Sequence, residues 1–483
     1  MTLGLVVLPS HGPRLHAAIV EPGPDLREIP VPWIKGPLGK MPGPDQLPLR
    51  PEMPDVLTMN DGTKVTTLAQ WEKRREEMKV ILQYYCIGQM PPAPGNVKGR
   101  QMMTEMVLDG QVRYRLVRLT FGPEEKLGFD IGVWTPATGG PFPTIINQAG
   151  TPPGGNVLPR LPRGPGRLGI DALLPVDEIK RQLAEKLAKA ASDGGDEPPG
   201  SDRRGSWSGG SAESTAQRYA EVFRRGYPLV LFNHNDCAED TASRMPDGSW
   251  AFRTTRFFPA YPGYDWGVIA AWAWGISRIA DYLETDPAID AKRMVITGAS
   301  RSGKAAMYAA AFDNRLMGAP VVTGGVGVGA LRFAGPRDSE TLDLMIKKLP
   351  NWFSPNLHEF WGHREKLPFD QHWFLALCAP TPFLALEGDT DRISLPEAVR
   401  QSYLHAKPAY ALYGATDRLG VHFSHHSHAF TDEDWTALLN FADRHLRGKK
   451  DFTFDWFPSD EDLDAAAASP GPGAGARAVS SKR

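Results

Sequence analysis

Met294-Val-Ile-Thr-Gly-Ala-Ser-Arg-Ser-Gly-Lys304 is the stretch that decides the fold. It begins as a short apolar strand, continues through a serine flanked by small residues, and ends in the first turn of a helix. A serine on such a sharp turn has its hydroxyl above the sheet edge, where the first amides of the next helix also point. This geometry nominates Ser300 as a hydrolytic nucleophile, although the common G-x-S-x-G spacing is altered because the second glycine comes at Gly303.

Strand and helix patterns alternate on both sides of this stretch. An early helix begins at Trp71, and paired strands are expected over 112–121 and 129–134. Further strands are expected over 143–147, 228–232, 294–298, 319–322, 383–387 and 409–413. The expected helices cover 267–284 and 303–312, begin again near Pro396, and cover 432–446. Repeated strand-then-helix order predicts an α/β fold with a doubly wound, mostly parallel sheet in a three-layer sandwich.

Composition shifts divide the chain into three parts. Residues 1–50 are rich in Pro and Gly and read as an extended leader, and residues 51–450 form the expected catalytic domain. Within that domain, 179–214 is an insertion whose Gly/Ser/Asp-rich part is expected to be mobile. Residues 451–483 form a C-terminal extension that ends in a low-complexity tail.

The bulk numbers exclude several classes of protein. Lys plus Arg is 54 and Asp plus Glu is 56, so the charge pattern gives no reason to expect nucleic acid or an acidic membrane as partner. Three cysteines are too few for a disulfide framework or a thiolate metal site, although one disulfide is possible. The apolar run 3–8 is shorter than a signal-peptide core and lacks a basic leader, so it is either the end of a signal or part of an intracellular chain.

The G-x-S-R-x-G-K pattern around Ser300 resembles the signature of the glucuronoyl esterases, carbohydrate esterase family 15, in their bacterial form. Three further segments resemble that family in the same order along 55–447, namely Asp265-Trp266 with 271–278, Asn351-Trp-Phe353 with 367–372, and His426-Ser-His-Ala-Phe430. The resemblance implies the α/β-hydrolase fold and a serine carboxylesterase that cleaves esters of (4-O-methyl-)glucuronic acid linking xylan to lignin alcohols. It further implies no cofactor, no metal, a monomer, and a secreted or periplasmic location, although this chain carries no complete signal peptide.

A serine hydroxyl needs a histidine base within hydrogen-bond reach and a carboxylate that orients this base. Four histidines precede the helix that begins after Thr431. His428 is nearest to the helix and matches the family position, so it is the expected base, with His426 as the alternative.

The acid follows the strand 383–387, where the carboxyl end of a parallel strand faces the nucleophile. Asp391 matches the family aspartate there, and Asp389 is the runner-up because aspartates also favour turns for structural reasons. A second family acid is absent, since Val322 stands where a glutamate would be expected.

Three more residues take their expected roles from the resemblance. Arg301 follows the nucleophile, so its backbone N–H and its guanidinium are expected at the oxyanion. Lys304 and Trp352 are expected to contact the sugar, the first through hydroxyls of the glucuronate ring.

Three other functions remain open on the sequence. The same chemistry could act on other esters such as acetylated sugars, which the loss of the glutamate at Val322 motivates. The four histidines His422, His425, His426 and His428 could instead bind a metal ion. The chain could also be a catalytically silent carbohydrate-binding relative.

Overall fold

The computed structural model describes residues 38–148, 212–333 and 339–450, together with isolated positions between 158 and 185. The expected C-terminal extension, most of the leader and most of the 179–214 insertion lie outside the described residues.

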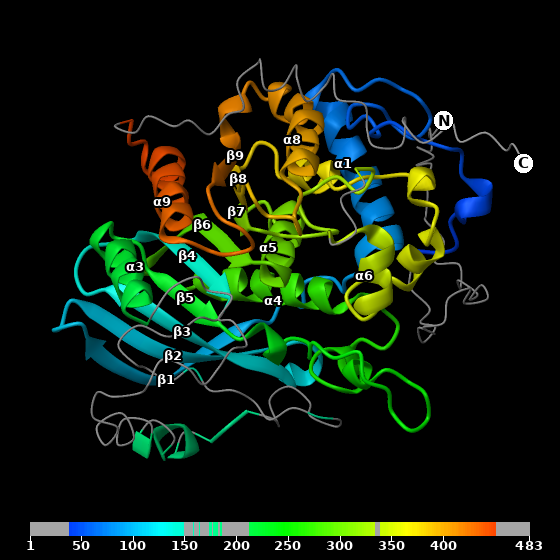
Figure 1. Ribbon diagram of the computed structural model, residues 1–483. Coiled ribbons are helices and arrows are strands. Elements are labelled where there is room, and N and C mark those ends of the chain that lie inside the picture. Colours follow the sequence, from blue (N-terminus) through cyan, green and yellow to red (C-terminus); the bar gives the residue numbers. More distant parts are fainter. Residues whose placement is uncertain are drawn as a thin grey trace, which may run out of the picture.

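A twisted sheet of nine strands forms the centre of the described chain, in the spatial order β1-β2-β3-β5-β4-β6-β7-β8-β9 (Figure 1). The strands are β1 (Lys98–Val107), β2 (Val112–Phe121), β3 (Leu127–Pro136), β4 (Phe142–Gln148), β5 (Leu229–Phe232), β6 (Ile289–Ala299), β7 (Leu316–Val321), β8 (Phe383–Gly388) and β9 (Leu419–Ser424). Neighbours from β5 to β9 are all parallel, whereas β1, β2, β3 and β5 pair antiparallel. The α/β-hydrolase class expected from the sequence is confirmed.

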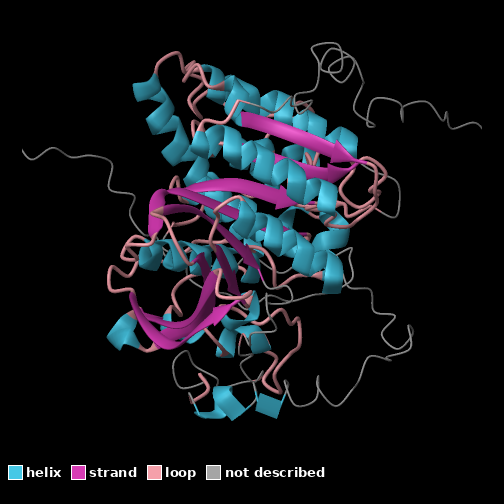
Figure 2. Ribbon diagram, turned by 90° about the vertical axis from the view of Figure 1, so that its left-hand side faces the viewer, coloured by secondary structure: helices cyan, strands magenta, loops and turns pink. Residues whose placement is uncertain are grey.

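Helices cover both faces of this sheet (Figure 2). One layer consists of α1 (Leu68–Leu82), α4 (Val268–Leu283), α5 (Arg301–Phe312), α7 (His372–Leu377) and α8 (Pro396–Ala411), and the other of α3 (Ala212–Arg224) and α9 (Asp432–Arg447). Successive strand residues point to opposite layers, as on β6, where Val295 packs with α9 and Ile296 packs with α4. Two-sided burial explains why the parallel strands are continuous apolar runs.

The structure departs from the expected elements in several places, and the helices α3, α6 (Leu342–Lys348) and α7 were not expected. The strand expected over 409–413 is wrong, because α8 continues through Pro408 to Ala411 and the last strand is β9. The apolar and aromatic residues at 409–413 favour a strand locally, but Ala409 and Tyr410 instead bury a helical face in the core. β1 was not expected, because it is an edge strand whose residues are mostly exposed and carry no apolar alternation.

Two global features bear on the expectations from composition. Cys86, Cys237 and Cys378 are free and buried, so the possible disulfide is not formed. Within the described ranges, the search for a helix long and apolar enough to cross a bilayer finds none.

Candidate active site

Ser300 lies on a strained turn between β6 and α5. Its backbone has φ 56° and ψ −122°, a left-handed conformation that a residue with a side chain adopts only at a cost of about 1–3 kcal/mol. Its amide donates to the carbonyl of Val321 on β7 at 2.9 Å, which fixes the turn to the sheet edge. The sharp strand-to-helix turn expected for a nucleophile is therefore present. Ser300 is the residue just before α5, and the first backbone amides of this helix have no hydrogen-bond partner within it.

Two glycines make this turn possible. A Cβ on Gly298 would lie 2.8 Å from the carbonyl oxygen of Ser302, and one on Gly303 would lie 2.9 Å from the carbonyl oxygens of Gly298 and Val321. Both distances are too short for real contacts, so neither position accepts a larger residue without movement of the backbone. The required second glycine is at 303, which explains why the common spacing is shifted in this sequence.

His428 and Asp391 meet where the segments after β9 and β8 lie side by side. His428 Nδ1 is 2.7 Å from Asp391 Oδ2, and the side chains are 9% and 1% exposed. The other oxygen of Asp391 accepts the amide of Ile393 at 2.8 Å. Burial by itself raises the pKa of Asp391, but the hydrogen bond and charge of His428 and the amide of Ile393 outweigh it, so this pKa is lowered. The carboxylate is ionised and can orient the imidazole of His428 as a base.

The alternative residues have other partners. His425 Nδ1 lies 3.0 Å from Asp389 Oδ2 at the surface, and His426 Nε2 lies 3.1 Å from Asp434 Oδ2. His422 Nε2 lies 2.9 Å from Ser424 Oγ, and burial lowers the pKa of His422 to about 4. Across the described residues, no group of three His, Cys, Asp or Glu side chains is arranged to share a metal ion. His422 and His426 are linked through Ser424 and Asp434, whereas His425 and His428 each contact a different aspartate.

Arg301, Lys304 and Trp352 form one cluster beside the turn. The Arg301 guanidinium lies 5.1 Å and the Lys304 ammonium 5.3 Å from the centre of the Trp352 ring. Arg301 Nη1 also forms an ion pair with Asp240 Oδ2, and its side chain is 43% exposed. By contrast, Lys304 is 1% and Trp352 is 2% exposed. The direct sugar contacts expected for these two residues stay predictions.

The Lys304 ammonium is engaged within the protein. Its Nζ donates to the carbonyl of Thr323 and lies 3.5 Å from Glu340 Oε2. Burial lowers the pKa of Lys304, and the negative charge of Glu340 opposes part of this effect.

Known proteins resemble this chain in sequence and in fold. Residues 215–414 match the family model "Glucuronyl esterase, fungi". The chain is 28% identical over 433 residues to a carbohydrate esterase from an unknown prokaryotic organism, covering 82% of this chain and 90% of that protein. It is 25% identical to 4-O-methyl-glucuronoyl methylesterase 1 of Wolfiporia cocos, covering 84% of this chain and 83% of the relative. A solved carbohydrate esterase family 15 glucuronoyl esterase from Caldicellulosiruptor kristjansonii is 29% identical with a TM-score of 0.59, over 84% of this chain and 95% of that one.

The chain is similar to glucuronoyl esterases in sequence and in fold. The resemblance seen in the sequence is confirmed, and the prokaryotic relative agrees with the bacterial form. The expected enzyme class, a carboxylic ester hydrolase, is likewise confirmed by the esterase names of the relatives.

At the end of β7, the position where the resemblance led us to expect a glutamate carries Val322. Val322 is 1% exposed, has φ 37°, and donates its amide to the carbonyl of Leu386 at 2.8 Å. Its side chain is apolar and packs with the α9 layer, so this position supplies no carboxylate to the site. Asp391 is thus the carboxylate that the described residues place on His428.

A second acid that the sequence reasoning missed lies on β8 itself. Glu387 is fully buried, and its Oε1 accepts both the amide and the hydroxyl of Thr323, at 3.3 and 3.2 Å. Burial and then the negative charge of Asp391 raise the pKa of Glu387 to about 8. The sequence analysis treated 383–387 as one buried strand, and the sequence pattern does not indicate that the Glu387 side chain at the end of this strand is buried beside Asp391.

This carboxyl predicts a specific dependence of stability on pH. Because its folded pKa of about 8 lies above the ordinary value of 4.5, the folded protein retains a proton that the unfolded chain has released. The free energy of unfolding therefore falls as the pH rises from about 5 to about 8, and this one group accounts for a decrease on the order of 4 kcal/mol. Glu387→Gln should remove that loss, which urea unfolding at pH 5, 7 and 9 would show as a growing advantage of the variant. Glu52→Gln, at an exposed position, is the control, and parallel curves for Glu387→Gln and wild type would contradict the prediction.

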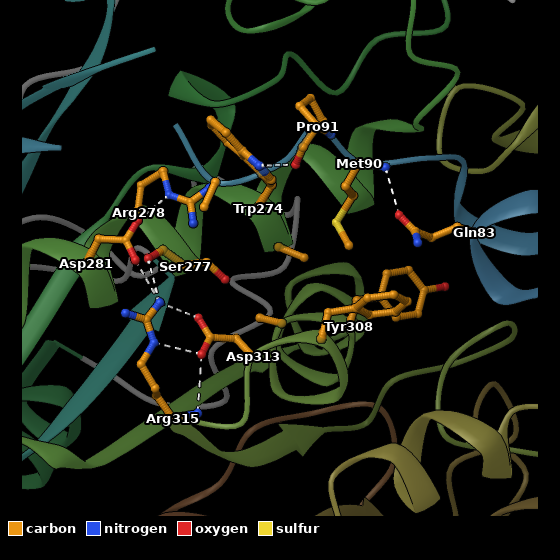
Figure 3. Close-up of a pocket in the computed structure, with 14 residues that line it drawn as sticks. Gln83, Met90, Pro91, Trp274, Ser277, Arg278, Asp281, Tyr308, Asp313 and Arg315 are labelled. Carbon is orange, nitrogen blue, oxygen red and sulfur yellow. Dashed lines mark hydrogen bonds and ion pairs between the residues drawn. The ribbon is translucent and has the colours of Figure 1, made fainter. Parts of the chain in front are cut away.

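A cavity of about 480 Å³ lies elsewhere in this esterase (Figure 3). Residues at the C-terminal end of α5, among them Tyr308, Phe312 and Asp313, line this cavity. Ser300 lies at the opposite, N-terminal end of the same helix, which has 12 residues and is roughly 18 Å long. Arg315 forms ion pairs there with Asp281 and Asp313, and Trp274 Nε1 donates to a backbone carbonyl. The charges are mutually neutralised, and the cavity does not belong to the site around Ser300.

Proposed function

We propose that the chain hydrolyses esters of glucuronic or 4-O-methyl-glucuronic acid with Ser300 as nucleophile, His428 as base and Asp391 as the orienting acid. The observation that carries the proposal is the pair formed by His428 Nδ1 and Asp391 Oδ2 at 2.7 Å, at the same sheet edge as the strained turn of Ser300. The similarity of the chain to glucuronoyl esterases supports the hydrolysis of uronic acid esters.

The reaction follows from these positions. His428 Nε2 removes the hydroxyl proton as Ser300 Oγ attacks the uronoyl carbonyl, and Asp391 stabilises the imidazolium that forms. The backbone N–H and the guanidinium of Arg301 stabilise the negative oxygen of the tetrahedral intermediate. The C–O bond to the alcohol then breaks, and His428 protonates the leaving oxygen. Water, deprotonated by the same imidazole, attacks the acyl-serine, releases the uronate and restores Ser300.

The natural substrate proposed is the ester between a glucuronoxylan side chain and a lignin alcohol. The support is that relatives are named 4-O-methyl-glucuronoyl methylesterases. Action as a monomer, and secretion or export to the periplasm where plant cell-wall polysaccharide can be met, belong to the same proposal.

Substrate choice tests this proposal directly. The purified chain should hydrolyse the methyl and benzyl esters of D-glucuronate with kcat/KM at least about 10-fold above that for acetylated xylose, because one mismatched group in a built pocket costs about 1–3 kcal/mol. Release of acid is followed by titration at pH 7. Preference for the acetylated sugar would instead support the broader esterase alternative, and binding of glucuronoxylan with no turnover of any ester would support a silent relative.

A further inference from the structure

Asp240 joins three segments of the chain beside the nucleophile turn. It lies on the connection that follows β5, just beyond the short helical turn His234–Asp236. One carboxylate oxygen forms the ion pair with Arg301 Nη1. The other accepts Trp352 Nε1 at 2.7 Å and Asn351 Nδ2 at 3.3 Å. The side chain of Asp240 is 12% exposed, so these contacts are largely shielded from water.

The two groups bound by Asp240 also touch each other. The Arg301 guanidinium lies 5.1 Å from the centre of the Trp352 ring, within range of a cation–π interaction. The ring is almost fully buried, and its N–H is bound to the same carboxylate, so it offers a fixed surface. Arg301 is therefore oriented by a carboxylate at one nitrogen and by an aromatic face, while its side chain as a whole is 43% exposed.

A long, exposed arginine without such contacts would sample many rotamers, and only some of them would place an N–H beside the reacting oxygen. The carboxylate of Asp240 accepts a hydrogen bond from Nη1 of Arg301, and the other N–H groups of the guanidinium can donate to a ligand. Donors that are already oriented need no reorganisation when the negative oxygen forms, which is the physical source of oxyanion stabilisation.

We propose that Asp240 is a positioning residue that acts through Arg301, with the Trp352 ring as the surface against which the guanidinium is held. This proposal rests on the proposed function, since it assigns Arg301 to the oxyanion of the reaction at Ser300. It gives Trp352 a part in orienting Arg301 that does not require its buried ring to touch the sugar.

Asp240→Asn tests the proposal selectively. The asparagine oxygen can still accept from Trp352 Nε1, but its amide group cannot accept from Arg301. The expected result is a fall in kcat for methyl glucuronate of about 10- to 100-fold with KM changed by less than about 3-fold, because ground-state binding is kept. Trp352→Phe keeps a ring and removes the N–H, and it should lower kcat in the same direction by a smaller factor. This second variant decides the question if Asp240→Asn does not fold.

A double-mutant cycle separates positioning from a general structural role. In an Arg301→Ala background, Asp240→Asn should cost almost nothing further, since the residue through which it acts is gone. Asp286→Asn is the matched control, because it also removes an Arg–Asp pair, with Arg115 at 2.6 Å, away from the turn. That variant should keep the wild-type kcat. Equal losses from Asp240→Asn with and without Arg301, or an unchanged kcat in a folded Asp240→Asn, would overturn the proposal.

A second measurement does not depend on which ester is the natural substrate. It is the rate at which the wild type and Asp240→Asn are inactivated by a p-nitrophenyl phosphonate ester. Its reaction with a serine hydroxyl also develops a negative oxygen at the same place, whatever ester the enzyme prefers. Wild type that reacts with the phosphonate but hydrolyses no glucuronate ester would refute the proposed substrate alone. A 10-fold slower inactivation of Asp240→Asn would then still support the positioning role, and equal inactivation rates would refute it.

Discussion

Ser300→Ala should lower kcat for methyl glucuronate by on the order of 10⁴- to 10⁶-fold, because the acyl-enzyme path needs the hydroxyl oxygen and no other nucleophile can take its place. The variant should fold normally. Alanine has the same backbone preference as serine at the strained φ of 56°, and the turn is fixed by the backbone bond from residue 300 to Val321. The measurement is the rate of acid release, with a thermal unfolding curve to show that the fold is kept.

Ser302→Ala is the matched control for this experiment. Ser302 lies in the same first turn of α5, and the contact that the structure gives it runs through its carbonyl, which accepts from Gln148 Nε2 at 2.7 Å. Its hydroxyl can therefore be removed with little change in rate. If Ser302→Ala were the inactive variant and Ser300→Ala remained active, the nucleophile would have been placed at the wrong residue.

The second large effect is expected for Asp391→Asn, with a loss in kcat of roughly 10⁴-fold. An asparagine amide that replaces the accepting oxygen would favour the wrong tautomer of His428, whose Nδ1 now lies 2.7 Å from the carboxylate. The imidazole would then present a proton rather than a lone pair to Ser300. The loss should appear in kcat at neutral pH, measured across pH 5 to 9 with methyl glucuronate.

Asp389→Asn tests the same loop two residues earlier. Asp389 is paired with the exposed His425 rather than with His428, so its removal should leave kcat within about 3-fold of wild type, as expected of an exposed ion pair. A severe loss in Asp389→Asn together with a mild one in Asp391→Asn would reverse the assignment of the acid.

The sequence predicted the parts of the site that have a local signature. The apolar strand, small residues and glycines around Ser300 specify the turn within a few positions, so its geometry could be expected from the residues alone. The choice of His428 and Asp391 depended on the family resemblance, because four histidines and two aspartates are close in sequence. The structure separates them by giving His425, His426 and His428 three different carboxylate partners.

What could not be predicted depends on contacts between distant segments. Asp240 is 61 positions from Arg301 and 112 from Trp352, and an aspartate on a long connection resembles any turn aspartate. Local spacing carries no information about burial, so the almost complete burial of Lys304 and Trp352 could not be predicted, and their sugar contacts stay predictions. The strand expected over 409–413 is wrong because the helical packing of α8 in the core overrides a local preference for a strand.

The central claim is that one hydroxyl, at Ser300, carries the acyl group of a uronate ester. Its most direct test is to inactivate the protein in steps with a serine-reactive phosphonate ester and to map the label by peptide mass spectrometry at each step. The predicted result is a single label on Ser300 that rises in proportion to the loss of methyl glucuronate hydrolysis. Full hydrolytic activity after complete labelling of Ser300, or complete inactivation with the label on another residue, would contradict the account.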